Sequence, residues 1–300
     1  MLTTHIHNRI VALLASNAPL IMGVVNVTPD SFSDGGRFGC WSEFDYGSAI
    51  ALAMELHAQG AAIVDVGGEA SSFHRRGIEP VDGEQQMIRI IPVITGICAA
   101  DMPHRPGISV DTRNSDVAHA ALEAGADMIN DISAGEHDAK MFSVVANHGC
   151  AIVLMHREAE SPGQPARHYD DVCSHVFGYL AQRAQAALDA GIPANRIILD
   201  PGIGFGKSDA DNWKLLSGIA RLVAMRYPVL LGVSRKRFLA GLMPEDTTPL
   251  DGPRQDWTNR DTATAMATLL AAERGVRIHR VHQVALARSA LATLAAMTKA

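Results

Sequence analysis

The chain has 300 residues, 47% of them hydrophobic and 19% charged, which is enough for two average domains or one large α/β barrel. The net charge of −6 gives no reason to expect nucleic-acid binding, and no apolar run approaches the roughly 20 residues that span a bilayer. The four cysteines lack CxxC spacing, which argues against a zinc site or a disulfide framework and predicts a reducing, cytoplasmic location.

The first 18 residues are expected to form an N-terminal extension. Residues 9–16 resemble a signal peptide only faintly, because their apolar core of about six residues is shorter than a working hydrophobic region. We expect a helix or a strand there. No change of composition divides residues 19–300, so a single domain is predicted for them.

Short apolar runs rich in β-branched residues alternate with alanine-rich helical patterns along the rest of the chain. Unbroken apolar strands are typical of a parallel sheet that is covered by helices. The predicted strands are 19–25, 62–66, 107–110, 128–129 with its neighbours, 151–155, 196–199, 229–233 and 276–280. Helical patterns include 48–59, 115–123, 172–190, 212–225 and 262–273.

Four of these helical patterns are followed by a glycine that can close a helix in the left-handed conformation, namely Gly60, Gly125, Gly191 and Gly275. About eight β-α units in this length favour a single (β/α)₈ TIM barrel, an α/β fold, over an open sheet. Residues 157–170 and 243–260 are rich in Pro, Gly and polar residues, so we expect long surface loops there.

Polar residues stand at the end of nearly every predicted strand. In a barrel the carboxyl ends of all strands open on one face, so these side chains would converge on a single mouth. Any one of them can instead be a helix cap or a loop residue, as for Asp131. The set comprises Asn26, Asp65, Glu69, Asp111, Asn130, Asp131, His156, Asp200, Ser234, Lys236, Arg280 and His282.

The stretch Gly202–Ser208 imitates a nucleotide-binding P-loop. That motif needs a glycine five residues before Gly206, where this chain has Pro201, and proline offers no N–H to a phosphate. A P-loop nucleotidase is therefore a weak alternative. Lys207 is expected to be a loop residue near the mouth, and the glycines to let the backbone approach a flat heterocycle.

Taken together, the motifs resemble the dihydropteroate synthase family. The resemblance runs in order from about residue 19 to the last helix, with a motif after each strand. The residues that carry it are Asn26–Gly36, Asp65–Glu69, Ser109–Thr112, Asn130–Asp131, Leu154–His156, Leu199–Lys207, Ser234–Lys236 and Arg280–His282.

This resemblance implies a TIM-barrel enzyme that condenses 4-aminobenzoate with 6-hydroxymethyl-7,8-dihydropterin diphosphate, uses Mg²⁺ and forms a homodimer. It places the pterin on Asp111, Asn130, Asp200 and Lys236, with Met155 also in the substrate site. A buried polar set of this kind rejects a wrong ring, because its members would be left unpaired. The alternative for Asp200 and Lys236 is a structural ion pair at the barrel mouth.

The diphosphate is expected to meet Arg280 and His282, because arginine grips phosphate oxygens bidentately and the last helix begins there. Asn26 is the expected Mg²⁺ ligand, since Mg²⁺ prefers oxygen ligands and keeps several waters. The loop 27–33, with Thr28 and Asp30 as substrate-binding candidates, would close over the site. Asp30 is equally explained as a turn residue after proline.

For 4-aminobenzoate the resemblance implies Ser71, Ser234 and Phe205, the last as an aromatic wall. Here the chain departs from the family pattern: after Glu69 and Ser71, the usual Arg-Pro is replaced by Ser72-Phe73, and the loop to Gly77 differs. Arg75 and Arg76 are candidates for the missing guanidinium. Affinity for 4-aminobenzoate, and for sulfonamides that mimic it, depends on this loop.

Two further readings stay open at this point. A methyltetrahydrofolate methyltransferase-like barrel would share the pterin residues without needing Arg280 and His282 for a diphosphate. A pterin-binding paralogue with little or no synthase activity would explain the altered loop, although the otherwise complete motif set argues against it. The alanine-rich last helices are the expected dimer interface.

Overall fold

The structure is a computed structural model that describes residues 9–28, 45–69, 80–102, 104–158, 167–242 and 257–299. Eight parallel strands form one sheet in the order β6-β5-β4-β3-β2-β1-β8-β7. A parallel bridge between Leu199 and Val229 joins the two remaining edges, which closes the barrel. The strands are β1 (Leu20–Asn26), β2 (Ile63–Gly67), β3 (Gly107–Asp111), β4 (Met128–Asp131), β5 (Ala151–Met155), β6 (Ile197–Asp200), β7 (Leu230–Leu231) and β8 (Ile278–Val281).

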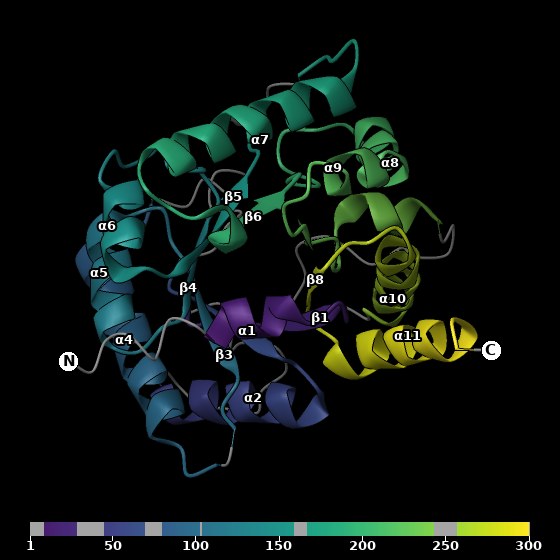
Figure 1. The fold of residues 1–300 in the computed structure, drawn as a ribbon. Helices are drawn as coiled ribbons and strands as arrows, with labels where there is room; N and C mark the ends of the chain where they lie inside the picture. The colour runs from purple at the N-terminus through teal and green to yellow at the C-terminus, as the bar shows by residue number, and fades with distance from the viewer. Residues whose placement is uncertain are drawn as a thin grey trace.

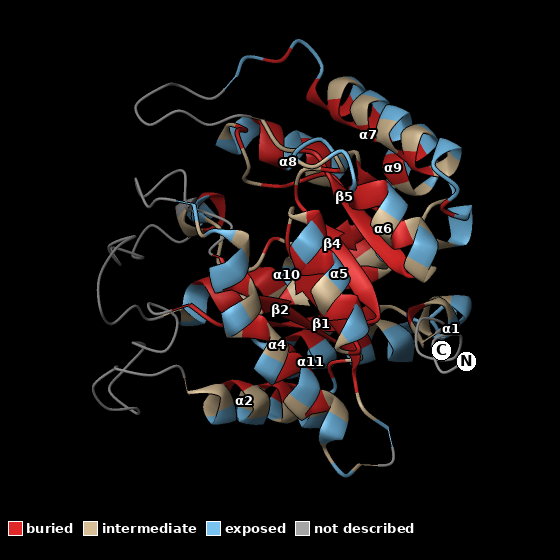
Figure 2. Cartoon of the chain, turned by 90° about the vertical axis from the view of Figure 1, so that its left-hand side faces the viewer, coloured by how far each residue is buried: buried red, intermediate tan, exposed pale blue. Residues whose placement is uncertain are grey.

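Helices surround the barrel, as Figure 1 shows, and Figure 2 shows that their exposed faces point away from the buried strands. The predicted (β/α)₈ architecture is thereby confirmed. Among the described helices, none is both long and apolar enough to cross a membrane. The helices are α1 (Arg9–Ala15), α2 (Tyr46–Gln59), α4 (Gly83–Ala99), α5 (Ser115–Glu123), α6 (Met141–His148), α7 (Val172–Asp189), α8 (Asp209–Ser217), α9 (Ile219–Val223), α10 (Thr258–Glu273) and α11 (Val284–Met297).

The helix boundaries follow local chemistry. Gly60, Gly125, Gly191 and Gly275 all have positive φ, between 91° and 116°, as expected for residues that close a helix. The pattern at 212–225 predicted one helix, but the structure divides it into α8 and α9 at Gly218. Of the predicted loop 243–260, residues 258–260 belong to α10, and residues 243–256 lie outside the described part of the chain.

Two hydrophobic layers result from the alternation of side chains along the strands. The residues that point outward pack under the helices, and Val64, Val66, Ile129 and Leu199 are examples. The residues that point inward fill the barrel, and their cluster comprises Leu20, Met22, Ile63, Met128, Ala151, Val153, Ile198, Leu230, Ile278 and Ile10 from α1. In Figure 1, α1 lies across this end of the barrel. The packed interior leaves the carboxyl ends of the strands as the place for a site.

Candidate active site

The predicted strand-end residues share the inward-facing positions of the barrel. Asn130, Met155, Asp200 and Arg280 each stand two residues after a member of the interior cluster, namely Met128, Val153, Ile198 and Ile278. Because side chains alternate along a strand, all four point into the barrel just above its apolar filling. Asp111 and Asn26 occupy the equivalent positions at the ends of β3 and β1.

A charged network crosses the barrel mouth between β8, β2, β3 and β4. The Arg280 Nε donates to Asp65 Oδ2 over 2.7 Å, and the Arg280 Nη2 lies 3.4 Å from Asp111 Oδ2. The Asn130 amide donates to the same Asp65 oxygen over 3.1 Å. Burial opposes the charge on Arg280, but Asp65, Asp111 and Asp200 outweigh it, so the Arg280 pKa lies above its ordinary value. The network therefore holds two predicted site residues, Asp111 and Asn130, around a third, Arg280, which is a permanent cation.

Asp65 is a central member of this network whose role the sequence reasoning left unassigned. It is fully buried in β2, and a buried carboxylate requires a partner. A charged residue in the middle of the apolar run Ile63–Gly67 was the available signal. Its second oxygen, Oδ1, is buried and has no hydrogen-bond partner among the described residues. Such an orphaned acceptor costs free energy, so Asp65 depends on Arg280 and Asn130 for its stabilisation.

Asp200, at the end of β6, is held by the loop that follows it. Its Oδ1 accepts from the Gly202 N–H over 2.7 Å. Burial raises the pKa of Asp200, although the Gly202 hydrogen bond and the charges of Lys236, Lys207 and Arg280 act in the opposite direction. A buried carboxyl group of this kind can accept hydrogen bonds from the N–H groups of a flat heterocycle that enters the mouth.

The loop after β6 is organised around the amine of Lys207. This buried amine donates to the carbonyl oxygens of Gly202 and Phe205, each over 2.9 Å, and to that of His156 over 3.3 Å. Gly202, Gly204 and Gly206 all have positive φ, which L side chains rarely adopt. The lysine thus stabilises the loop conformation, which agrees with its interpretation as a loop residue rather than a phosphate ligand.

Lys236 and Phe205 form one wall of the mouth. The Lys236 ammonium lies 4.2 Å from the centre of the Phe205 ring and donates to the carbonyl oxygen of Ile203. This cation–π contact joins the segment after β7 to the loop after β6. The ring and the amine are therefore presented together, as a stacking surface beside a donor.

Ser234 and His282, which the sequence assigned to different substrates, touch each other. The Ser234 Oγ lies 2.8 Å from His282 Nδ1 and accepts from the His282 backbone N–H over 3.1 Å. Burial, with the charges of Arg235, Arg280 and Lys236, lowers the His282 pKa to about 3, so the ring is neutral at neutral pH. In the tautomer in which the serine hydroxyl donates to Nδ1, the proton of the ring lies on Nε2, from which it can donate to an anion.

Arg235 is a second residue to which the sequence gave no role. Its guanidinium binds both oxygens of Asp261 on α10, over 2.8 and 2.9 Å, and lies over the ring of Trp257. Arg235 also has a positive φ of 59°, uncommon for a residue other than glycine. The pair anchors the Ser234–Lys236 segment to α10 and so fixes the directions of Ser234 and Lys236.

Some predicted residues add little or lie outside the described chain. Thr28 is buried at the end of the described part of the first loop. Asp30 and Ser71 lie outside the described residues, as does most of the altered loop. The two ends of that loop are held together, because Glu69 Oε1 accepts from the Val81 N–H over 2.8 Å. Asp131 points outward and accepts from the N–H groups of Ser133 and Gly135, so it stabilises the turn after β4. It does not cap the following helix, which begins only at Met141.

The amide of Asn26 has the chemistry and the position for the implied Mg²⁺. A Cβ on Gly67 would lie 3.8 Å from the Asn26 Oδ1 and 3.5 Å from the Asp111 Cβ, so the amide oxygen stands over a gap that glycine leaves. A single amide oxygen suits a cation that keeps most of its waters and takes its other ligands from phosphate oxygens. The residues present therefore fit the metal.

Comparisons with known proteins agree with this geometry. A family model described as "Pterin binding enzyme" matches residues 22–282. The chain is 41% identical to a dihydropteroate synthase of Streptococcus pyogenes serotype M6 over 264 residues, 88% of this chain and 90% of the relative. It is 40% identical to that of Mycobacterium leprae, over 94% of each chain.

Solved structures of the same kind superpose over almost the whole chain. The dihydropteroate synthase of Xanthomonas albilineans with 4-aminobenzoic acid has a TM-score of 0.79 and 39% identity, and the match covers 94% of each chain. The same protein in complex with 7,8-dihydropteroate has a TM-score of 0.78 and 38% identity, over 94% of this chain and 95% of that one. The residues matched by the family model, 22–282, include the carboxyl ends of all eight strands.

Proposed function

This chain belongs to the dihydropteroate synthase family of pterin-binding enzymes, and from that we propose how its own residues carry out the reaction. The enzyme is a transferase of folate biosynthesis that joins 6-hydroxymethyl-7,8-dihydropterin diphosphate to 4-aminobenzoate, which yields 7,8-dihydropteroate and diphosphate. The observation that carries the assignment of roles is the Asp65–Arg280–Asp111 network with Asn130, because it links the pterin side of the mouth to the phosphate side.

On the pterin side, Asp111, Asn130 and Asp200 would pair with the ring's N–H groups, and Lys236 would donate to a ring oxygen or nitrogen. Their inward positions and the burial of Asp200 support this assignment. Phe205 and Met155 would flank the flat ring. Asp200 and Lys236 are already held by the loop after β6. Asp111 and Asn130 are held by the Arg280–Asp65 network, so little ordering is left for binding.

On the phosphate side, Arg280 and the Nε2–H of His282 would donate to diphosphate oxygens beside the first turn of α11, and Thr28 and Asp30 would complete this end. Mg²⁺, held by Asn26, would neutralise charge on the diphosphate. Stabilising the leaving diphosphate in this way lowers the barrier to breaking the bond between its oxygen and the pterin methylene carbon. The amine of 4-aminobenzoate then bonds to that carbon and loses a proton, for which no strong base is needed.

The 4-aminobenzoate carboxylate would be bound by Ser234 and by Ser71. Support comes from Ser234, which Arg235 and Asp261 hold beside the phosphate site, so the two substrates would meet at one place. In this half-site Ser72-Phe73 stands where the family has Arg-Pro. The 4-aminobenzoate site is therefore the part in which the chain differs most from the family pattern.

The experiment is to incubate the purified protein with the dihydropterin diphosphate, Mg²⁺ and 4-aminobenzoate, and to measure dihydropteroate and diphosphate separately. Both products are expected in equal amounts, with the reaction lost on removal of Mg²⁺ by chelation. Diphosphate release without dihydropteroate would place the defect in the altered loop. Formation of neither product would overturn the proposed roles.

We also propose a homodimer in the cytoplasm, formed through α10 and α11. These helices pack side by side (Figure 1), and they expose Met266, Leu270, Leu286 and Met297 to solvent. Exposed apolar side chains on two neighbouring helices are consistent with an interface. The thiols of Cys98, Cys150 and Cys173 are unpaired, which agrees with a reducing location. Light scattering should give twice the chain mass, and Leu270→Glu should give the mass of one chain.

A further inference from the structure

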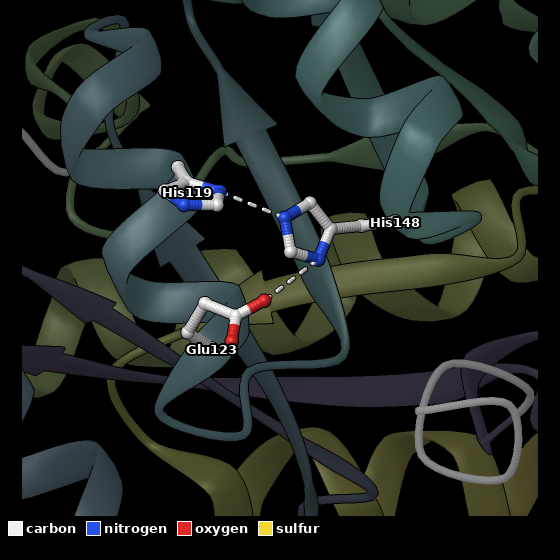
Figure 3. Close-up of side chains that lie close together, drawn as sticks. All are labelled: His119, Glu123 and His148. Atoms are coloured by element: carbon white, nitrogen blue, oxygen red, sulfur yellow. Dashed lines mark hydrogen bonds and ion pairs between the residues drawn. The ribbon is translucent and has the colours of Figure 1, made fainter. Parts of the chain in front are cut away.

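Two histidines and a glutamate gather on the outer surface of the barrel, away from the mouth. His119 and Glu123 lie one turn apart on α5, so they share a face of that helix, and His148 is the last residue of α6. Figure 3 shows the three side chains turned toward one another across the gap between the two helices. One ligand atom from each lies within 4.8 Å of those of the other two.

The distances suit a small ion. The His119 Nδ1 and the His148 Nε2 are 2.9 Å apart, in a hydrogen bond that needs one proton between two imidazoles. A tetrahedral zinc ion with Zn–N bonds of about 2.0–2.1 Å separates two such nitrogens by roughly 3.3 Å. The pair therefore has to open by only a few tenths of an ångström. Glu123 now faces the other nitrogen of the His148 ring, with its Oε1 3.7 Å from Nδ1. To join the two imidazoles on one ion, its exposed carboxylate has to rotate toward the Nε2 side of that ring.

The electrostatic setting also suits a cation. Glu123 and His148 are the last residues of α5 and α6, and helix C-termini carry a partial negative charge. Burial, and then the neighbouring His119, lower the pKa of His148, so its ring is readily neutral and able to act as a ligand. Two neutral imidazoles and one carboxylate give the cluster a net charge of −1.

We propose that His119, Glu123 and His148 form a binding site for a divalent transition-metal ion, with Zn²⁺ as the best fit, that fastens α5 to α6. Imidazole nitrogen with one carboxylate selects zinc and its neighbours in the transition series over Mg²⁺, which prefers oxygen ligands. Three protein ligands leave a fourth position for water. Both helices end next to the start of a strand, β4 or β5, at the opposite end of the barrel from the active site.

A second cluster, His156, Glu158 and His175, has similar ligands but a less favourable setting. The Arg167 guanidinium already binds Glu158 over 2.8 Å. Burial lowers the pKa of His156, and the nearby Lys207 ammonium lowers it further. A divalent ion would meet both positive charges there. We therefore expect zinc at the α5–α6 cluster first, and the second cluster becomes the natural comparison.

The experiment is a zinc titration of the full-length protein after treatment with EDTA and dialysis, in competition with a chromogenic zinc chelator at pH 7.5. The wild type is expected to bind one Zn²⁺ that His119→Ala and His148→Gln each bind at least tenfold more weakly. Glu123→Gln should show a smaller loss. Affinity should fall as the pH is lowered, because protons compete with the metal for its ligands, and millimolar Mg²⁺ should not compete.

His168→Ala, at an exposed histidine outside both clusters, is the matched control and should bind zinc like the wild type. His119 is exposed, so its substitution should leave the fold and dihydropteroate synthesis unchanged, and bound zinc should raise the Tm of the wild type but not of His119→Ala. Wild-type zinc affinity in both His119→Ala and His148→Gln would overturn the proposal. So would loss of the tight zinc ion on His175→Ala alone.

Discussion

Each charged side chain in the barrel mouth depends on a neighbour from another strand, and this sets what single substitutions will do. Arg280 from β8 holds Asp65 from β2 and Asp111 from β3, and Asn130 from β4 shares Asp65 with it. Removing one member leaves another buried and without its partner, which costs more than the contact itself contributes. Residues that bind substrate here are therefore also residues that stabilise the mouth.

Arg280→Lys tests this double role while keeping the positive charge. A lysine ammonium cannot present the planar fork that reaches two carboxylates and a diphosphate together. We expect kcat/KM to fall roughly 10- to 100-fold, corresponding to the ~1.5–3 kcal/mol of a hydrogen bond to a charged group, with the free energy of unfolding reduced by ~1–3 kcal/mol. Diphosphate release and urea unfolding measure the two effects.

The control for Arg280→Lys is Arg277→Lys, just before the same strand. Arg277 donates to the carbonyl oxygens of Leu14 and Ser16 at the other end of the barrel. Its substitution should leave kcat/KM within about twofold. Equal losses in the two variants would mean that Arg280 acts only through stability.

At the scale of elements, the loop after β6 shows why the motif predicted which residues lie at the site but not the hydrogen bonds that hold them there. Residue types and order located Asp200, the glycines and Phe205. No local pattern predicted that the Lys207 amine binds three carbonyl groups. One of the three belongs to His156, which is 51 residues away in sequence. Asp65 and Arg235 were left without a role for the same reason, since their partners Arg280 and Asp261 come from other elements.

Gly202→Ala tests the conformation of this loop. Gly202 has a φ of 64°, and a Cβ there would collide with the carbonyl oxygen of His156, the same oxygen that Lys207 binds. The left-handed conformation costs a non-glycine residue about 1–2 kcal/mol, and the collision adds to it, so we expect a loss of about 3 kcal/mol or more with a large fall in turnover. Urea unfolding and the synthase assay measure both.

Gly191→Ala separates backbone strain from the collision. Gly191 has a φ of 91°, yet no atom of the described chain lies within 4 Å of a Cβ at that position. This variant should lose only about 1–2 kcal/mol and keep its turnover. Equal losses of stability and turnover in the two variants would show that the collision with the His156 carbonyl oxygen does not cause the effect of Gly202→Ala.

For the molecule as a whole, the alternation of residues in strands made the fold predictable. The eight apolar runs predicted a parallel barrel, and the polar residue at each carboxyl end predicted the mouth, because both follow from local patterns. The sequence did not predict where a helix ends within a continuous helical pattern, as the break at Gly218 shows. The contribution of α1 was not visible either, since it depends on how the closed barrel is filled.

Ile10→Ala tests whether α1 is part of the barrel's core. Ile10 is fully buried in the interior cluster, and a Cβ on Gly107 would lie only 2.7 Å from its Cδ1. Truncating a buried isoleucine costs about 2–5 kcal/mol, so unfolding should occur at clearly lower urea concentration, with the KM for both substrates unchanged. Ala12→Ser, on the exposed face of α1, should change stability by less than about 0.5 kcal/mol. Equal free energies of unfolding in the two variants would show that α1 does not contribute to the barrel's core.

Acid should destabilise the folded molecule through histidines that it buries uncharged, and His279 in β8 offers the cleanest test. Both of its ring nitrogens lack partners among the described residues, and burial lowers its pKa from 6.5 to about 4. The unfolded chain therefore takes up a proton at a pH at which the folded chain does not. The stabilisation is complete above pH 6.5 and is lost as the pH falls toward 4.

From pH 7.5 to pH 5 this single group should remove about 2 kcal/mol from the free energy of unfolding. His279→Leu cannot bind the proton, so its free energy of unfolding should fall by about 2 kcal/mol less than that of the wild type over the same interval. His156 and His282, with pKa values of about 3, contribute in the same direction and remain in both proteins. Urea unfolding at the two pH values measures the difference. Parallel losses in the two proteins would show that His279 takes up its proton equally well in the folded state.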